Sequence, residues 1–209
     1  MTVQSNEDFK GLDMYNPVDS TKAQCMSSEG YNFLCRYYAP LGAAKLLTKS
    51  ESQTISNAGM DVVPVYEWGG TEASHFNYDN GVSNGREAIS RALEIGQPFD
   101  TAIYFAVDYP ATSADIPNIK DYFRGVSAAM QESKNYNGGR WTSGVYGSYL
   151  VVSELDGYSG VNYTWQTYAW SGGDDYIYRD IYQYSNGQRV CSHDIDLNAS
   201  KGGWGGFRI

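Results

Sequence analysis

The sequence predicts an α/β fold, a single TIM-like barrel domain over residues 1–209 with eight strands in a (β/α)5β3 arrangement. Strand-like runs alternate with helix-like stretches over the first two-thirds of the chain, which is typical of parallel βαβ units. After about residue 160, three more strand-like runs follow too closely for full helices between them. No Pro/Ser linker, charge block or internal repeat divides the chain. Eight strands close a barrel, and 209 residues are at the small end for that fold.

The predicted strands are apolar runs of strand length. Those of the five β/α units are FKGLDMY (9–15), YNFLCRYY (31–38), MDVVPVYEW (60–68), TAIYFAVDY (101–109) and WTSGVYGS (141–148). The last three are VNYTWQTYAW (161–170), DIYQYS (180–185) and HDIDLN (193–198). An open doubly wound sheet is the alternative, and it is disfavoured because GLDMYNP, at the first strand, offers no Gly-rich phosphate loop.

Capping residues and apolar spacing indicate the helices. After the second strand, Thr48 and Glu51 form a capping box, and Gly59 ends the helix. GREAISRALEI (85–95) precedes the fourth strand, and a last helical stretch lies near residues 148–156. A longer helix follows the fourth strand and carries apolar residues at helical spacing, at Ile119, Phe123, Val126 and Met130.

The composition limits the function classes. The net charge is −9 and no Lys/Arg cluster is present, which argues against nucleic-acid binding. The longest apolar stretches are far short of the roughly 20 residues of a membrane helix. The polar N-terminal run MTVQSNEDFKG lacks the apolar core of a signal peptide. The 19 Tyr and 5 Trp residues have flat apolar faces and polar tips, which suit a polysaccharide partner. The sequence carries no signal of an oligomeric state.

Cysteines and histidines form no metal-binding pattern, so we expect no metal and no cofactor. Cys25, Cys35 and Cys191 lack metal-ligand spacing and cannot all pair, so we expect three buried thiols, with one disulfide as the alternative. His75 and His193 are too few for an ordinary zinc site. A metal site that joins an Asp to either histidine is a minor alternative.

Four carboxylates occupy comparable places in the predicted barrel. Asp13, Glu67 and Asp108 lie near the ends of the first, third and fourth strands, and Asp196 lies in the last strand. A charge in mid-strand would be buried unpaired, whereas the carboxyl end of a strand opens into the barrel mouth, where barrel enzymes keep their chemistry. Carboxylates that converge there repel one another, which separates an acid from a base, as glycoside hydrolysis requires. Each acid alone has a structural alternative, as a helix cap or as the partner of an arginine such as Arg36.

Aromatic residues at or near strand ends are candidates for stacking on sugar rings, although ordinary packing explains any one of them. In the fourth strand, Tyr104, Ala106 and Asp108 share one face, which we expect to line the lumen. The expected sugar-contacting or supporting residues are Tyr15, Tyr38, Tyr66, Tyr104, Tyr146, Trp170 and Gln183.

Five runs together resemble one family: GLDMYNP, GYNFLCRYYAP, LTKSESQTISNAGMDVVPVYEW, IYFAVDYP and SGVYGSY. It is the glycoside-hydrolase-like barrel family known as domain-of-unknown-function family 1906. That family is similar to the family 25 lysozymes, which are bacterial and phage muramidases with a (β/α)5β3 barrel. YTWQTYAW and IYQYSNGQRVCSHDIDLN resemble the C-terminal part of those lysozymes. The resemblance spans roughly residues 9–200.

The resemblance implies roles for the acids. Asp13, Asp108 and Asp196 match the first-strand, fourth-strand and last-strand aspartates of the lysozymes. Those lysozymes carry an Asp-x-Glu motif at the fourth strand whose Glu is the proton donor, whereas this chain has Pro110 at that position. Glu67, one strand earlier, is the nearest candidate to replace the missing donor.

We therefore expect a glycoside hydrolase that acts on bacterial cell-wall peptidoglycan or a related amino-sugar polymer, outside the cell or in the cell wall as the resemblance implies. Glu67 is the expected general acid, kept protonated by the apolar Trp68 and by neighbouring carboxylates. Asp108 stabilises the oxocarbenium-like state or positions the nucleophile, and Asp13 and Asp196 tune the charge and hold substrate. The alternative is a non-catalytic, wall-glycan-binding barrel that has lost its proton donor. A metal-dependent deacetylase is the third hypothesis.

Overall fold

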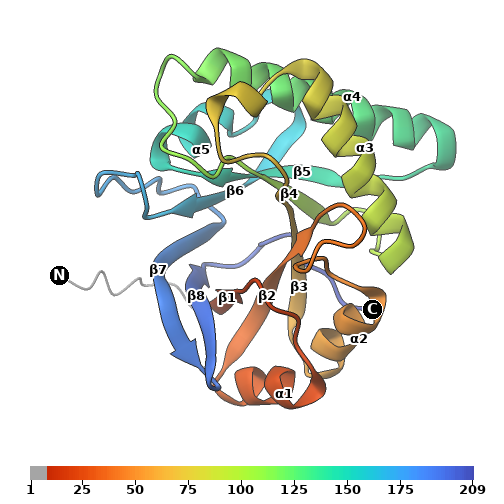
Figure 1. The fold of residues 1–209 in the computed structure, drawn as a ribbon, viewed down its shortest axis with the longest axis vertical. Coiled ribbons are helices and arrows are strands. Elements are labelled where there is room, and N and C mark those ends of the chain that lie inside the picture. Colours follow the sequence, from red (N-terminus) through yellow and green to blue (C-terminus); the bar gives the residue numbers. More distant parts are fainter. Residues whose placement is uncertain (1–8) are drawn as a thin grey trace.

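The computed structural model describes residues 9–209, and these form a closed barrel of eight strands in the order β1 to β8 (Figure 1). The predicted α/β barrel is confirmed. Strands β1 to β7 run parallel to one another, and β8 is antiparallel to both β7 and β1. Residues 1–8, part of the polar N-terminus in which we expected no signal peptide, lie outside the described residues. Within residues 9–209, no helix has the length and apolar character needed to cross a membrane.

Each strand-like run coincides with one strand of the barrel, although β7 and β8 extend beyond the predicted runs, to Val190 and Ser200. The strands are β1 (Phe9–Asp13), β2 (Tyr31–Tyr38), β3 (Asp61–Tyr66), β4 (Ala102–Ala106), β5 (Thr142–Gly147), β6 (Val161–Thr167), β7 (Ile181–Val190) and β8 (His193–Ser200). The α-helices are α1 (Ser20–Ser28), α2 (Lys49–Asn57), α3 (Tyr78–Ile95), α4 (Ile116–Asn137) and α5 (Tyr149–Leu155). Figure 1 shows α3, α4 and α5 on one side of the barrel and α1 and α2 on the opposite side.

Helix α3 begins at Tyr78, seven residues before the predicted start at Gly85, because glycines within it serve packing rather than a loop. A Cβ at Gly81 would lie 2.0 Å from the carbonyl oxygen of Tyr122 in α4, and one at Gly125 would lie 2.2 Å from that of Tyr78. The glycines therefore let the backbones of α3 and α4 approach closely. Helix α1 is not among the predicted helices because it has little apolar periodicity, and it begins at an Asp19 cap.

Side chains alternate between the lumen and the helices along each strand. In β4, Tyr104 and Ala106 belong to the cluster that fills the lumen, whereas Ile103, Phe105 and the following Val107 pack in the outer core beneath the helices. The predicted shared face of Tyr104 and Ala106 is confirmed. The lumen is therefore a packed core that ends in a mouth where the parallel strands end.

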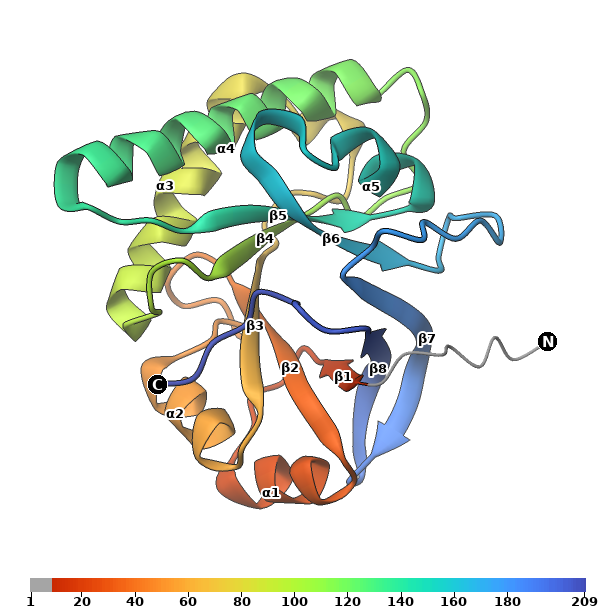
Figure 2. The ribbon, with the colours of Figure 1, turned by 180° about the vertical axis from the view of Figure 1, so that it is seen from behind.

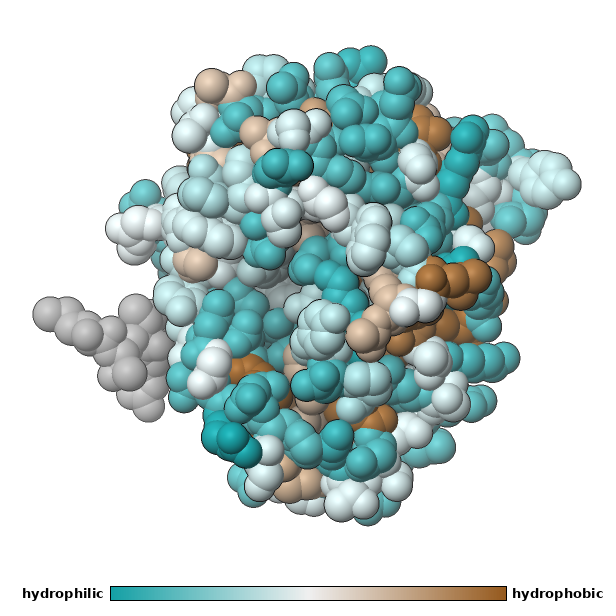
Figure 3. All heavy atoms as spheres, viewed as in Figure 1, coloured by the Kyte–Doolittle hydropathy of each residue, from teal (hydrophilic) through white to brown (hydrophobic). Residues whose placement is uncertain are grey.

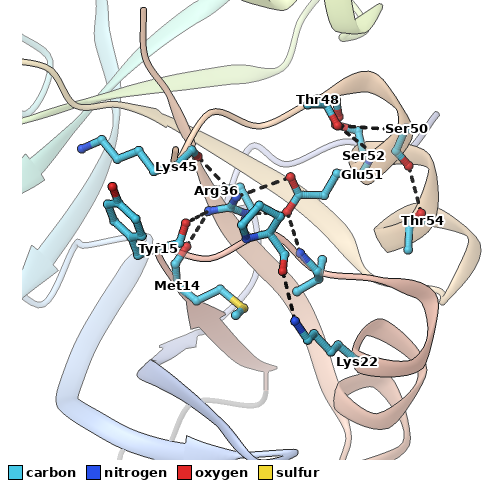
Figure 4. Close-up of polar contacts among 12 residues, drawn as sticks. Met14, Tyr15, Lys22, Arg36, Lys45, Thr48, Ser50, Glu51, Ser52 and Thr54 are labelled. Carbon is cyan, nitrogen blue, oxygen red and sulfur yellow. Dashed lines mark hydrogen bonds and ion pairs between the residues drawn. The ribbon is translucent and has the colours of Figure 1, made fainter. Parts of the chain in front are cut away.

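A buried guanidinium joins the loops on one side of the mouth (Figure 4). Arg36, on the outer face of β2, is fully buried and its Nε donates to Glu51 Oε1 at 2.7 Å. Its Nη1 donates to the carbonyl oxygens of Met14 and Tyr15, and its Nη2 donates to that of Lys45. Arg36 therefore pairs with Glu51 and not with a strand-end aspartate, and it ties the chain after β1 to the chain after β2.

Helix α2 begins as the capping residues predict, because the Glu51 N–H donates to Thr48 Oγ1 at 3.2 Å. The second interaction of a capping box, from the Thr48 backbone N–H to the Glu51 carboxylate, is replaced by other contacts. The Glu51 carboxylate accepts from Arg36 and from the backbone N–H of Val18, so it serves the buried ion pair rather than the helix end.

The C-terminal segment 201–209 closes the other end of the barrel, and Figure 2 shows it crossing the strands there. The Trp204 ring stacks on Phe33 with ring centroids 4.9 Å apart, and its Nε1 donates to Asp61 Oδ2 at 3.0 Å. The Tyr104 hydroxyl donates to the Trp204 carbonyl oxygen at 3.0 Å. The lumen is thus capped opposite the mouth.

Cys25 of α1 and Cys191 at the β7–β8 turn form a disulfide, so the expectation of three buried thiols is wrong. Cys35 is a free and buried thiol in the described chain. Cys191 and Ser192 are the two turn residues of the hairpin, and both have left-handed φ angles, of 50° and 65°. Such a turn normally takes Asn-Gly, so we infer that the crosslink helps to hold it.

We expect Cys25→Ser to lower the free energy of unfolding by roughly 2–5 kcal/mol, because the crosslink spans 166 residues of sequence and restricts the unfolded chain. Urea unfolding with and without a thiol reductant measures it. The reductant should bring the wild-type protein to the stability of the variant and leave the variant unchanged. Equal stability of the oxidised and reduced wild-type protein would contradict this expectation.

Candidate active site

One pocket of about 190 Å³ opens at the mouth of the barrel, on the largely hydrophilic face seen in Figure 3. All four predicted carboxylates, Asp13, Glu67, Asp108 and Asp196, line it. They come from three strand ends and from the antiparallel β8, whose Asp196 pairs in register with Asp13. The other lining residues are Tyr37, Val65, Tyr146, Trp165, Ala169, Trp170, Gln183 and Asn186.

Asp13 lies deepest of the four acids and is only 3% exposed. Its Oδ2 accepts hydrogen bonds from Gln183 Nε2 at 2.9 Å and from Asn198 Nδ2 at 2.6 Å. Burial raises the pKa of Asp13 to about 7, and the charge of Asp196 adds to the rise, although the two amide donors oppose it. Asp13 therefore changes its protonation state near neutral pH.

Asp108 and Asp196 are more accessible than Asp13. Burial raises the pKa of Asp108 to about 6, the charge of Glu67 adds to the rise, and the charge of Lys45 opposes it. Burial also raises the pKa of Asp196, while the backbone N–H of Gly187, which donates to its Oδ1 at 2.7 Å, lowers it. The expected mutual influence of the acids is thus present.

Glu67 has a partner that the sequence did not indicate. Its Oε1 lies 2.5 Å from the Nζ of Lys45, and the Lys45 Nζ also lies 4.7 Å from the centroid of the Tyr37 ring. We expected Trp68 to shield this carboxyl group, but the Trp68 side chain is 51% exposed and does not line the pocket. The immediate neighbour of Glu67 is therefore a cation and not an apolar ring.

Three of the expected sugar-contacting residues lie in the pocket: Tyr146, Trp170 and Gln183. The Tyr146 hydroxyl donates to Gln183 Oε1 at 2.9 Å, and the Nε2 of the same Gln183 donates to Asp13. Trp170 is half-exposed and has a left-handed φ of 58°. Its loop is fastened by Ser171, whose Oγ donates to the Thr167 carbonyl oxygen at 2.6 Å. A strained, fixed backbone that presents an aromatic ring is typical of a binding site.

The placement of Tyr38, Tyr66 and Tyr104 at the mouth is wrong, and Tyr15 follows β1 near the mouth but does not line the pocket. Tyr38 and Tyr66 point outward to the helices, where their hydroxyls donate to Gln97 and Glu87, because their neighbours Tyr37 and Glu67 take the inward positions. Tyr104 faces the lumen but is fully buried, and it supports the segment that closes the far end. The Tyr15 side chain is exposed.

Sequence reasoning missed Tyr37, Lys45 and Asn198. Strand alternation was a sufficient signal for Tyr37, because it follows the lumen residue Cys35 by two positions. Lys45 lies in a loop, where no periodic signal exists. In the described part of the chain, no group of three or more His, Cys, Asp or Glu side chains is arranged to hold a metal ion. The ring of His75 instead contacts the Asn84 side chain at 2.8 Å.

We expect Asp13→Asn to stabilise the fold at alkaline pH. The pKa of Asp13 is raised from 3.8 to about 7 in the folded state, so wild-type stability falls as pH rises from about 4 to about 7. The variant avoids this loss, and its free energy of unfolding should exceed that of the wild-type protein by roughly 4 kcal/mol at pH 8, since a pKa difference of one corresponds to about 1.4 kcal/mol. Urea unfolding at pH 5 and pH 8 measures the gain. A gain that is the same at both pH values would contradict the assignment.

Known structures with this fold include a Tat-secreted protein, an autolysin and a muramidase. The Tat-secreted protein Rv2525c of Mycobacterium tuberculosis, solved with L-tartrate, aligns over 95% of this chain and 98% of its own with a TM-score of 0.80 and 19% identity. The autolysin LytC of Streptococcus pneumoniae aligns over 91% of this chain and 46% of its own, with a TM-score of 0.62 and 11% identity. The muramidase of Acremonium alcalophilum aligns over 93% and 94%, with a TM-score of 0.56 and 11% identity. At these identities the likeness shows the fold alone.

Two curated proteins of Bacillus subtilis (strain 168), the uncharacterized FadG and YbfG, are 30% identical over 149 residues and 33% identical over 142 residues. The alignments cover 69% and 62% of this chain but only 25% and 19% of the relatives, so the chain spans a quarter of their length or less. Residues 24–203 match the family described as the Rv2525c-like, glycoside hydrolase-like domain. With most of its length covered by that match, the chain belongs to the Rv2525c-like, glycoside hydrolase-like domain family.

Proposed function

We propose that this barrel is a glycoside hydrolase that acts on bacterial cell-wall peptidoglycan or a related amino-sugar polymer. The convergence of Asp13, Glu67, Asp108 and Asp196 on one pocket is the observation that carries the proposal. Burial above all raises the pKa values of Asp13 and Asp108 to about 7 and about 6, so protonated and ionised carboxyl groups coexist near neutral pH. Cleavage of a glycosidic bond uses such a pair, one group as acid and the other as a stabilising carboxylate, nucleophile or base.

Asp108 is the proposed proton donor. It combines a raised pKa with partial exposure, whereas Asp13 is buried and its Oδ2 already accepts two amide donors. Asp108 gives its proton to the glycosidic oxygen, and the bond from that oxygen to the anomeric carbon breaks with its electron pair left on the oxygen. A water then adds to the anomeric carbon and gives a proton to a pocket carboxylate. This assignment replaces the expectation that Glu67 is the donor, because Glu67 adjoins a cation.

The remaining pocket residues suit a sugar. Trp170 and Tyr146 offer aromatic surface, and Gln183 offers an amide close to the acids. LytC was solved in complex with a synthetic peptidoglycan ligand, and Rv2525c is secreted. These two relatives support a wall glycan as substrate and a location outside the cell.

A non-catalytic, glycan-binding barrel is the second candidate, and Pro110 favours it. This residue is exposed just after β4 and has no proton to give where the family 25 lysozymes carry their donor. Such a protein would bind insoluble wall material without releasing reducing ends.

We expect Asp108→Asn to lower release of reducing ends from purified peptidoglycan by roughly 10²- to 10⁴-fold, because the amide cannot donate the proton. Glu67→Gln should cause a loss of similar size, because it removes the stabilising carboxylate. Both variants should stay folded by circular dichroism and should still bind the insoluble wall.

Glu29→Gln is the matched control, since this exposed residue lies at the end of α1, outside the pocket. It should act like the wild-type protein. Near-wild-type release by both pocket variants would exclude the proposed catalytic roles. Wall binding without release by the wild-type protein would favour the second candidate.

A further inference from the structure

Lys45, the cation beside Glu67, lies close enough to the pocket acids to influence their separate roles. The side chains of Lys45 and Glu67 are only 11% and 21% exposed, and their charged atoms are 2.5 Å apart. At this distance and with this little water, the attraction is stronger than that of a surface ion pair. The ammonium group also lies over the Tyr37 ring, 4.7 Å from its centroid, which adds a favourable cation–π contact.

Both partners are fastened to β2, so their contact is built into the fold. The Lys45 carbonyl oxygen accepts from Arg36 Nη2 at 3.3 Å, and the next residue, Leu46, forms a parallel bridge with Tyr37. On the other side, the Glu67 backbone N–H donates to the Tyr38 carbonyl oxygen at 3.2 Å. The ion pair therefore does not depend on a freely moving surface side chain.

The other titratable groups around Glu67 are acidic or phenolic. Lys45 supplies a positive charge among them, and it also lowers the pKa of Asp108. The titratable groups around Glu67 and Asp108 are Asp13 on β1, Tyr37 on β2, Lys45 after β2, Tyr146 on β5 and Asp196 on β8.

We propose that Lys45 is a positioning residue that holds the Glu67 carboxylate through the ion pair and aims it at the reacting sugar, so that Asp108 is left as the carboxyl group that gives the proton. This role rests on the proposed glycosidase function. Lys45 itself transfers no proton and forms no bond in the reaction. It holds the Glu67 carboxylate in place before the sugar binds, and that carboxylate then stabilises the positive charge that develops at the anomeric carbon.

Lys45→Met tests the role, because methionine keeps most of the volume and removes the charge. We expect the pH optimum of kcat to move upward by roughly one unit, since Asp108 loses a neighbouring cation that lowers its pKa. At pH 5, kcat should fall roughly tenfold, while KM changes little. Lys45→Arg should restore most of the wild-type profile. Lys49→Met, at an exposed position on α2, is the matched control and should change nothing.

A readout without substrate separates this role from the proposed function. Carbon NMR of the side-chain carboxyl groups should show that Asp108 takes up its proton at a higher pH in Lys45→Met than in the wild-type protein. An unchanged titration of Asp108 would overturn the role of Lys45, whether or not the protein cleaves a glycan. A loss of kcat by the same factor at every pH would overturn it too, because that result indicates a merely structural role. An inactive wild-type protein with the expected NMR shift would instead overturn the glycosidase function.

Discussion

Alternation of side chains in a closed barrel is the constraint on which the rest of the structure depends. Every second residue of a strand points into a lumen without bulk water, so it must be apolar or fully hydrogen-bonded until the strand reaches the mouth. Segment 201–209, with Trp204, closes the opposite end. Polar inward positions such as Tyr37, Glu67 and Asp108 are therefore confined to one end, where they line a common pocket. The clustering of acids there follows from the architecture, and their raised pKa values follow from the clustering and the burial.

Strand residues that point outward, away from the lumen, also support the pocket. Arg36 faces away from the lumen, yet its guanidinium binds Glu51 and the backbone of two neighbouring loops of the mouth, at Met14 and at Lys45. A fully buried arginine is costly unless each donor finds an acceptor, and here charge and backbone oxygens supply them. Removing one partner would leave a buried charge and release the loop that brings Lys45 to Glu67. The ion pair behind the barrel thus connects the packing of α2 to the electrostatics of the pocket.

Period-two patterns and strand ends made the barrel and its four acids predictable from the sequence, since both signals are local. The same alternation also excluded Tyr66 from the mouth once Glu67 was placed inside, and our expectation for Tyr66 overlooked this consequence. Lys45 was not predictable, because it reaches the pocket from a loop with no periodicity. The Cys25–Cys191 disulfide was missed for a different reason. Its cysteines are 166 residues apart, and only the curvature of the β7–β8 hairpin over α1 brings them together.

The most direct test of the central claim, that these carboxylates hydrolyse a glycosidic bond, is digestion of purified peptidoglycan in water enriched in oxygen-18. Mass analysis of the soluble fragments should find one heavy oxygen at each new reducing end with the wild-type protein, because water adds at the anomeric carbon. Asp108→Asn should release almost none. If the wild-type protein produces no labelled reducing ends at any pH between 4 and 8, while it binds the same material, the hydrolytic account is contradicted and the pocket serves only to hold the glycan.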